Sequence, residues 1–236
     1  VFAKWSVNTA EGHWDFIGDY WQQDIDNELL SSTGSVSGPP GEVVSLSTAS
    51  DESERWRFGV HHMVEQVAGF DMLHWQLDYQ ESSFDQLEEQ LQENPGSAMP
   101  PIPQSANRTL EEEHFDQKQW SFSLRVQKEI DSHNLVSGID WLQQDFTRPV
   151  DRIIIDEITG TQSKTYAGVT YPGKTFPDTE TRQAGFYFQD HWRINEKLAL
   201  LAGLRYDFYK SEPKTDDAYN NFNTSGASLE SRSDDH

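Results

Sequence analysis

Histidines and carboxylates are the side chains of this sequence best suited to bind a metal ion or a haem. His61 and His62 are adjacent, and adjacent residues of a β-strand point to opposite faces, so the two cannot share one metal site. We expect them to be structural or to face a water-filled lumen. His114 follows Glu111–Glu113, and a loop histidine beside three carboxylates is a conceivable contact for haem or a cation. We expect this acidic run to be solvated instead.

Other polar groups are also candidates for chemistry. Asp24, Asp26 and Glu28 alternate along the chain and would share one face of a strand, where their oxygens suit a divalent cation, although we expect solvated charge. The stretch Gly160–Thr165 (GTQSKT) ends like a phosphate-binding loop but lacks its second glycine and a following helix. There is no G-x-S-x-G elbow and no recognisable triad. We therefore predict a protein that is not an enzyme, with no metal site and no cofactor of its own.

The composition excludes several classes of protein. The 236 residues hold 40 Asp and Glu against 18 Lys and Arg, a net charge of −22, which argues against nucleic acid as a partner. The absence of cysteine excludes disulfides, a Cys-ligated zinc or iron–sulfur site and a thiol nucleophile. No stretch approaches eighteen apolar residues, so no transmembrane helix is expected. A transmembrane β-barrel needs apolar residues only at alternate positions, and a mean hydropathy of −0.77 is compatible with one.

Alternation of apolar and polar residues dominates the chain and predicts an all-β, antiparallel fold. The only expected helix is a short acidic one at Phe84–Gln92, inside a loop. Eight strands are expected, at about residues 1–7, 14–20, 55–64, 73–79, 120–127, 134–146, 184–189 and 198–209.

Short and long connections alternate between these strands. Such an order is typical of an outer-membrane β-barrel, which has short periplasmic turns and long extracellular loops. A soluble β-sheet binding protein is the alternative from a different class, but it has no reason to place every long loop at one end. Tight turns are expected at Asn8–Gly12, Ala68–Asp71, Asp131–Asn134 and Arg193–Lys197, and long loops at about Asp24–Glu54, Ser82–His114, Thr147–Thr181 and from Ser211 onward.

The two faces of the expected strands differ in chemistry. The residues predicted to face lipid are Trp120, Phe122, Leu124, Val126, Phe186, Phe188, Leu198, Leu200, Leu204 and Tyr206. The alternate positions suit a wet lumen and include Arg125, Gln127, Arg205 and Asp207, with Gly138, Gly185 and Gly203 relieving crowding. Aromatic residues near strand ends are predicted to form interfacial girdles, namely Trp5, Trp141, Trp192, Tyr206 and Phe208.

The segment Phe176–Lys210 resembles a barrel stretch of the TonB-dependent receptors, and within them the haem, haemoglobin and transferrin/lactoferrin receptor family. The cues are a P-D-[ST]-x-T run at Pro177–Thr181, a G-x-[YF]-x-Q-D strand at Gly185–Asp190 and a G-[LI]-R-Y-D strand. This last motif consists of Gly203, Leu204, Arg205, Tyr206 and Asp207. Two hairpins resemble the same branch: Trp56–Tyr79, with WQLDYQ from Trp75, and Phe115–Asp145, with LVSGIDWLQQD.

The resemblance implies a plug domain inside a 22-stranded barrel that imports an iron-containing ligand with energy from an inner-membrane TonB complex. Residues 1–236 are then expected to be about eight strands of that barrel, with the plug, the TonB box and the C-terminal strands outside them. The implied partners are outer-membrane lipid, the TonB complex through the plug, and extracellular haem, a haem protein or a siderophore, in a bacterial outer membrane. Haem or an iron chelate would be transported. The alternatives are a siderophore receptor, another TonB-dependent receptor or a passive porin.

Overall fold

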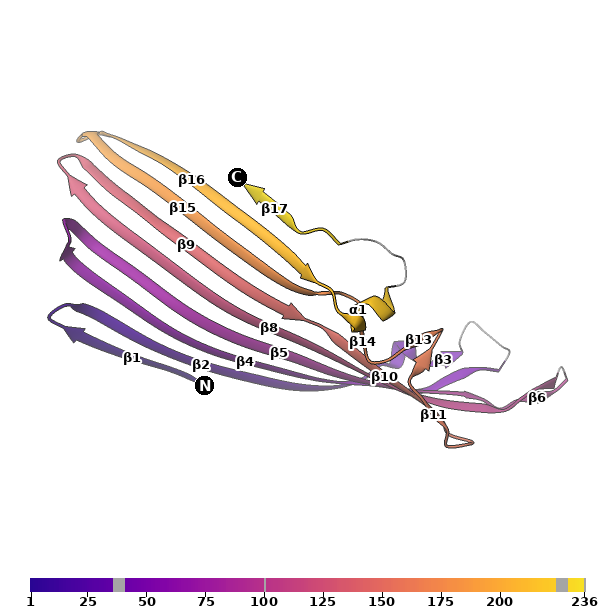
Figure 1. The fold of residues 1–236 in the computed structure, drawn as a ribbon. Coiled ribbons are helices and arrows are strands. Elements are labelled where there is room, and N and C mark those ends of the chain that lie inside the picture. Colours follow the sequence, from indigo (N-terminus) through magenta and orange to yellow (C-terminus); the bar gives the residue numbers. More distant parts are fainter. Residues whose placement is uncertain (36–40, 100, 224–228, 236) are drawn as a thin grey trace.

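The computed structural model describes residues 1–35, 41–99, 101–223 and 229–235, and most of it is one curved antiparallel sheet (Figure 1). Its eight long strands lie side by side in chain order, which confirms the predicted strand number and fold class. The sheet remains open, since β1 pairs only with β2 among the described residues. The long strands are β1 (Phe2–Thr9), β2 (Gly12–Glu28), β4 (Val43–Val67), β5 (Phe70–Asn94), β8 (Ser105–Ile130), β9 (His133–Thr147), β15 (Asp178–Asn195) and β16 (Leu198–Lys214).

Four short turns gather at one end of the sheet, here called the turn end (Figure 1). All four lie where the sequence predicts them. The turn from β4 to β5 uses left-handed backbone at Ala68 and Gly69, with φ of +51° and +84°. Gly12 opens β2, and a Cβ there would lie only 2.3 Å from the Met63 carbonyl oxygen. A larger residue would therefore disturb this corner of the sheet.

The opposite end, here called the loop end, carries the long excursions of the chain (Figure 1). The strand β10 turns away from β9 and pairs instead with the N-terminal half of β8, from Val150 opposite Glu113 to Asp156 opposite Asn107. The remaining elements are η1 (Leu30–Ser32), β3 (Gly34–Ser35), β6 (Ser97–Ala98), β7 (Pro101–Ile102), β10 (Pro149–Asp156), β11 (Gln162–Ser163), β12 (Thr165–Tyr166), β13 (Val169–Thr170), β14 (Gly173–Lys174), α1 (Asp217–Phe222) and β17 (Arg232–Asp235). Two small hairpins, β6–β7 and β12–β13, form separate two-stranded sheets.

The predicted helix at Phe84–Gln92 is wrong, because these residues belong to β5. Their backbone groups pair on both sides, with Phe84 opposite Ser53 and Phe115. The strands β4, β5 and β8 are 25, 25 and 26 residues long, so the predicted loops Asp24–Glu54 and Ser82–His114 are mostly strand. Much of Thr147–Thr181 also consists of short strands. The parts of the predicted loops at residues 36–40, 100, 224–228 and 236 lie outside the described residues.

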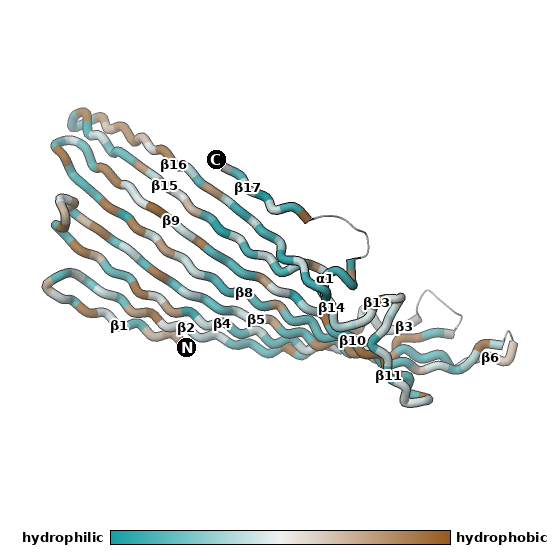
Figure 2. The backbone as a smooth tube through the Cα atoms, in the orientation of Figure 1, coloured by the Kyte–Doolittle hydropathy of each residue, from teal (hydrophilic) through white to brown (hydrophobic). Residues whose placement is uncertain are grey.

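The sheet is a single layer with almost no core. Among the described residues only Val44, Ala49 and Val150 are buried hydrophobic residues. Large apolar side chains are instead exposed, among them Leu204 at 76% and Leu198 at 54%. Apolar and polar positions alternate along the turn-end half of the strands, whereas the loop end is mostly hydrophilic (Figure 2). No helix in the described part of the chain is long and apolar enough to cross a membrane.

Candidate functional site

The cross-strand register gathers the exposed apolar side chains onto one face of the sheet. Residues directly opposite in an antiparallel pair share a face, and Phe122 lies opposite both Leu77 and Trp141. Towards β16, Phe186 lies opposite Tyr206. The apolar face defined in this way contains all ten residues predicted to face lipid and the five predicted girdle residues. Their contact with lipid stays a prediction.

Aromatic side chains contact one another on the apolar face, mainly across neighbouring strands. The rings of Tyr20 and Trp56 are 4.2 Å apart, and those of Tyr79 and Trp120 are 4.7 Å apart. The imidazole of His62 stacks on Trp14 at 3.7 Å. A surface of this chemistry is suited to contact with an apolar environment.

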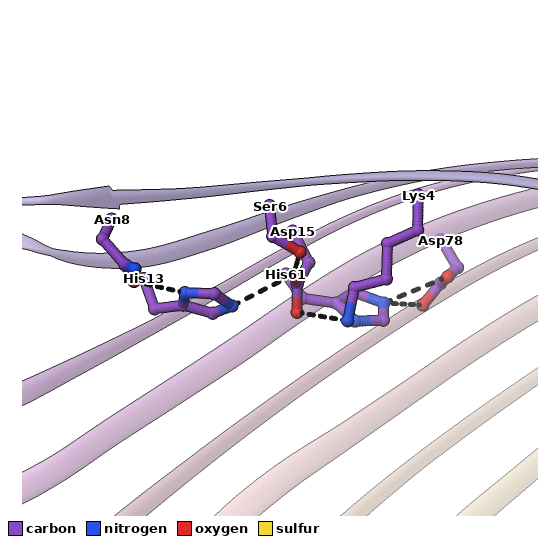
Figure 3. Close-up of polar contacts among 7 residues, drawn as sticks. All are labelled: Lys4, Ser6, Asn8, His13, Asp15, His61 and Asp78. Atoms are coloured by element: carbon purple, nitrogen blue, oxygen red, sulfur yellow. Dashed lines mark hydrogen bonds and ion pairs between the residues drawn. The ribbon is translucent and has the colours of Figure 1, made fainter.

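The opposite face, here called the polar face, carries a network of paired charges. Figure 3 shows Asp15 of β2 among Lys4, Ser6 and His13. The Ser6 hydroxyl donates to its carboxylate at 2.5 Å, and Lys4 and His13 each lie 3.1 Å from it. His13 is in turn 2.7 Å from the Asn8 side-chain oxygen. The side chains of β1 are thereby tied to those of β2.

A second charged cluster surrounds Asp78 of β5, which is only 7% exposed. Arg57 donates to its carboxylate at 3.0 Å and His61 lies 3.4 Å away (Figure 3 shows His61 with Asp78). The carboxylate lies over Gly59, where a Cβ would be 2.4 Å from the Asp78 oxygen. His61 is thus on the polar face and His62 on the apolar face, as the alternation predicts.

A third cluster joins β9, β15 and β16. Arg205 donates to Asp207 on its own strand and to Asp140 of β9, both at 2.9 Å. The guanidinium lies over Gly185, and the Tyr187 ring lies over Gly138 in the same way. At Gly203, by contrast, the nearest side-chain atoms are those of Gln189, at an ordinary contact distance of 3.8 Å from a Cβ placed there. Two of the three glycines predicted to relieve crowding therefore do so, through close side chains of the neighbouring strand.

At the loop end, the polar face forms a pocket of about 290 Å³ between β5, β8, β10 and the β12–β13 hairpin. Arg152 of β10 donates to the carboxylate of Glu111 opposite it on β8 through two of its nitrogens. Its guanidinium lies 5.0 Å from the ring centre of Tyr166 and 5.2 Å from that of Tyr171. The pocket is lined by Glu88, Gln90, Thr109, Glu111, Arg152 and Tyr166, among others.

Near this pocket, side-chain contacts join the segment containing β14 to the segment containing α1. Lys174 of β14 donates to Asp178 at 2.8 Å and to Asp216, at the start of α1, at 2.6 Å. The Phe222 ring of α1 covers Gly173. The hydrogen bond from Lys174 holds the pKa of Asp216 below its usual value, and the Tyr219 amide acts in the same direction. Partial burial opposes the charge of Lys174, but its hydrogen bonds to the two carboxylates raise its pKa overall.

A family model described as "TonB dependent receptor-like, beta-barrel" matches residues 4–233. The chain belongs to the TonB-dependent receptor β-barrel family. Members of this family are outer-membrane receptors and transporters, not enzymes. The match does not distinguish the haem branch from the others. No curated protein matches the chain.

The residues considered as metal or haem ligands from the sequence do not form a binding site in the described structure. His114 is part of β8, not a loop, and its side chain contacts Asp85 and lies 3.9 Å from Glu112. The strand register places the His114 side chain on the same side of the sheet as the apolar face, whereas the pocket lies on the polar face. Asp24, Asp26 and Glu28 share a face and are exposed, both as predicted. No group of three His, Asp or Glu in the described ranges is placed to hold a metal ion.

The loop-end pocket has no counterpart in the expectations from sequence. Residues 150–155 (VDRIII) lie within a predicted loop, although β-branched residues of this kind favour a strand. This run of residues is the feature of the sequence that could have predicted β10. Gly160–Thr165 contains β11 and the first residue of β12, with no helix after it, in keeping with its rejection as a phosphate loop.

Proposed function

We propose that this chain is part of the wall of an outer-membrane receptor that imports haem, or iron from a haem protein, with energy from the TonB complex. The observation that supports haem as the ligand is the resemblance of three separate hairpins to the haem branch. They correspond to β4–β5, β8–β9 and β15–β16, which together form most of the described sheet. The TonB complex would act through a plug domain inside the barrel.

The chemistry of the two faces supports this role. The apolar face would contact outer-membrane lipid, because a single-layer sheet whose described part buries only three hydrophobic residues has no core for its aromatic and aliphatic side chains. The polar face, with its paired charges, would line the water-filled interior. The loop end would then extend beyond the outer leaflet and meet the ligand first.

The experiment uses the complete receptor, expressed in the outer membrane and purified in a neutral detergent. Titration with haemin should produce a saturable Soret band of bound haem, and cells carrying the receptor should grow with haemoglobin as their iron source. An unchanged Soret spectrum together with no growth would favour a siderophore receptor, another TonB-dependent receptor or a porin. Recovery of the protein in buffer without detergent would contradict the membrane location and favour a soluble β-sheet binding protein.

A further inference from the structure

The loop-end pocket has a floor of polar side chains from three strands. On one row, Glu88 of β5 lies opposite Glu111 of β8, which lies opposite Arg152 of β10. On the next row, Gln90 lies opposite Thr109. The floor therefore offers carboxylate, amide and hydroxyl groups within one cavity of about 290 Å³.

One wall of the pocket is aromatic and held in place. The guanidinium of Arg152 lies against the Tyr166 ring and the Tyr171 ring, and it is also bound to Glu111. These contacts fix the β12–β13 hairpin beside the floor. Tyr166 nevertheless remains 53% exposed, so much of its ring is available to a ligand.

The charge in the pocket is unbalanced. Arg152 neutralises Glu111, whereas the Glu88 carboxylate has no hydrogen bond or ion pair with any residue that the structure describes. Two carboxylates directly opposite each other on neighbouring strands repel. Among the described residues that line the pocket, Arg152 is the cation, and it is already bound to Glu111. A cationic ligand would remove this repulsion and contact an aromatic ring at the same time.

We infer that this pocket binds a lysine or arginine side chain on the surface of the protein that carries the haem or iron. The inference rests on the proposed function and makes it more specific. Glu88 would supply the ion pair, Tyr166 the aromatic surface, and Gln90 and Thr109 hydrogen-bond partners for the rest of the side chain. An anionic ligand is disfavoured, because the carboxylates of free haem would enter a pocket whose net charge is negative.

The surroundings support a basic protein partner. Residues 80–119, which contain the loop-end halves of β5 and β8, hold nine Asp or Glu and two Lys or Arg, counted over both faces of the sheet. Three of the nine, Glu88, Glu111 and Glu113, lie on the polar face with the pocket. The excess of negative charge at the loop end attracts basic patches over several ångströms and increases the rate of association at low salt. A metal ion is a poorer occupant, because the described carboxylates and histidines form no group of three suited to one.

The test measures binding to the complete receptor in neutral detergent, with fluorescently labelled acetyl-trilysine amide as the probe. Wild-type receptor should bind it saturably, and Glu88→Gln and Tyr166→Leu should each weaken binding about three- to ten-fold. Glu112→Gln is the matched control. It makes the same change of charge one residue from Glu111 but on the opposite face, and it should leave binding within about two-fold of wild type. Equal weakening by all three variants would overturn a specific pocket.

Two further probes separate the possible outcomes. Haemoglobin binding should weaken in Glu88→Gln while haemin binding is unchanged, and unchanged haemoglobin binding would overturn the inference. Spermidine carries the same three positive charges as the peptide, and tighter binding of spermidine would overturn the assignment to a protein side chain. If wild-type receptor binds neither haemoglobin nor haemin, the proposed function fails, whereas the trilysine result still decides whether the pocket binds a basic side chain.

Discussion

The guanidinium of Arg205 on β16 donates to the Asp140 carboxylate on β9 at 2.9 Å, although β15 lies between these two strands. The contact is possible because β15 has Gly185 at the crossing point, where a Cβ would lie 2.6 Å from an Arg205 nitrogen. Arg205 also binds Asp207, which lies two residues along the same strand. Arg205 and Asp207 of the G-[LI]-R-Y-D motif therefore help to link β9, β15 and β16 on the polar face.

We predict a small but measurable coupling between Arg205 and Asp140. Both side chains are half-exposed, at 49% and 41%, so solvent screens their attraction. A double-mutant cycle of Arg205→Ala and Asp140→Asn in the complete receptor should give about 0.2–1 kcal/mol, measured by urea unfolding in lipid vesicles. A coupling that stays unchanged when Gly185 is replaced by leucine would contradict the route over β15.

Gly138 should tolerate a side chain much less well than Gly18. A Cβ at Gly138 would lie 2.4 Å from the Leu124 carbonyl oxygen, which is backbone and cannot rotate away. Gly138→Ala should therefore lower the free energy of unfolding by about 1–3 kcal/mol. Gly18→Ala is the matched control, because a Cβ there meets nothing within 4 Å. Equal unfolding midpoints for both variants would show that the sheet accommodates a Cβ at Gly138 without loss of stability.

The strands could be predicted from the sequence only where one face is apolar. Trp120, Phe122 and Leu124 alternate with serines, and this contrast reveals both the strand and its faces. Beyond that band both faces of β5 are polar, so the run Phe84–Gln92 looks like a helix or loop although it pairs on both sides. Hydrogen bonding to the neighbouring strands makes Phe84–Gln92 a strand, and this pairing cannot be deduced from the sequence of the segment alone.

The pocket could not be predicted from the sequence for a related reason. Glu88, Glu111 and Arg152 are far apart in the chain and meet only because β10 returns to the side of β8. Local patterns indicate faces within a strand but not which distant strand lies next to it. The positions of Arg205 and Asp207 on the polar face, in contrast, follow directly from alternation.

Leu204 and Leu201 provide a test of which face contacts lipid. They lie on the same strand, are 76% and 63% exposed, and belong to the apolar face and the polar face respectively. If the apolar face contacts lipid, Leu204→Arg should destabilise the receptor by about 2–4 kcal/mol near the bilayer midplane and less near its surface. Leu201→Arg should cost little. Unfolding in phospholipid vesicles measures both, and the opposite ranking would invert the assignment of the faces.

The contact between Lys174 and Asp216 should hold α1 in place above the ordinary carboxylate pKa and release it in acid. Because the pKa of Asp216 is lowered in the folded chain, its contribution to stability is complete above the ordinary value of 3.8 and is lost as the pH falls through the lowered pKa. Amide hydrogen exchange in residues 217–222, corrected for the intrinsic effect of pH, should accelerate over that range. Lys174→Met should give fast exchange already at neutral pH and reduce the pH dependence, since it removes the hydrogen bond that lowers the pKa of Asp216 most. If exchange in the Lys174→Met variant matches wild type at neutral pH, contacts such as Phe222 with Gly173 and Tyr171 hold the helix without the ion pair.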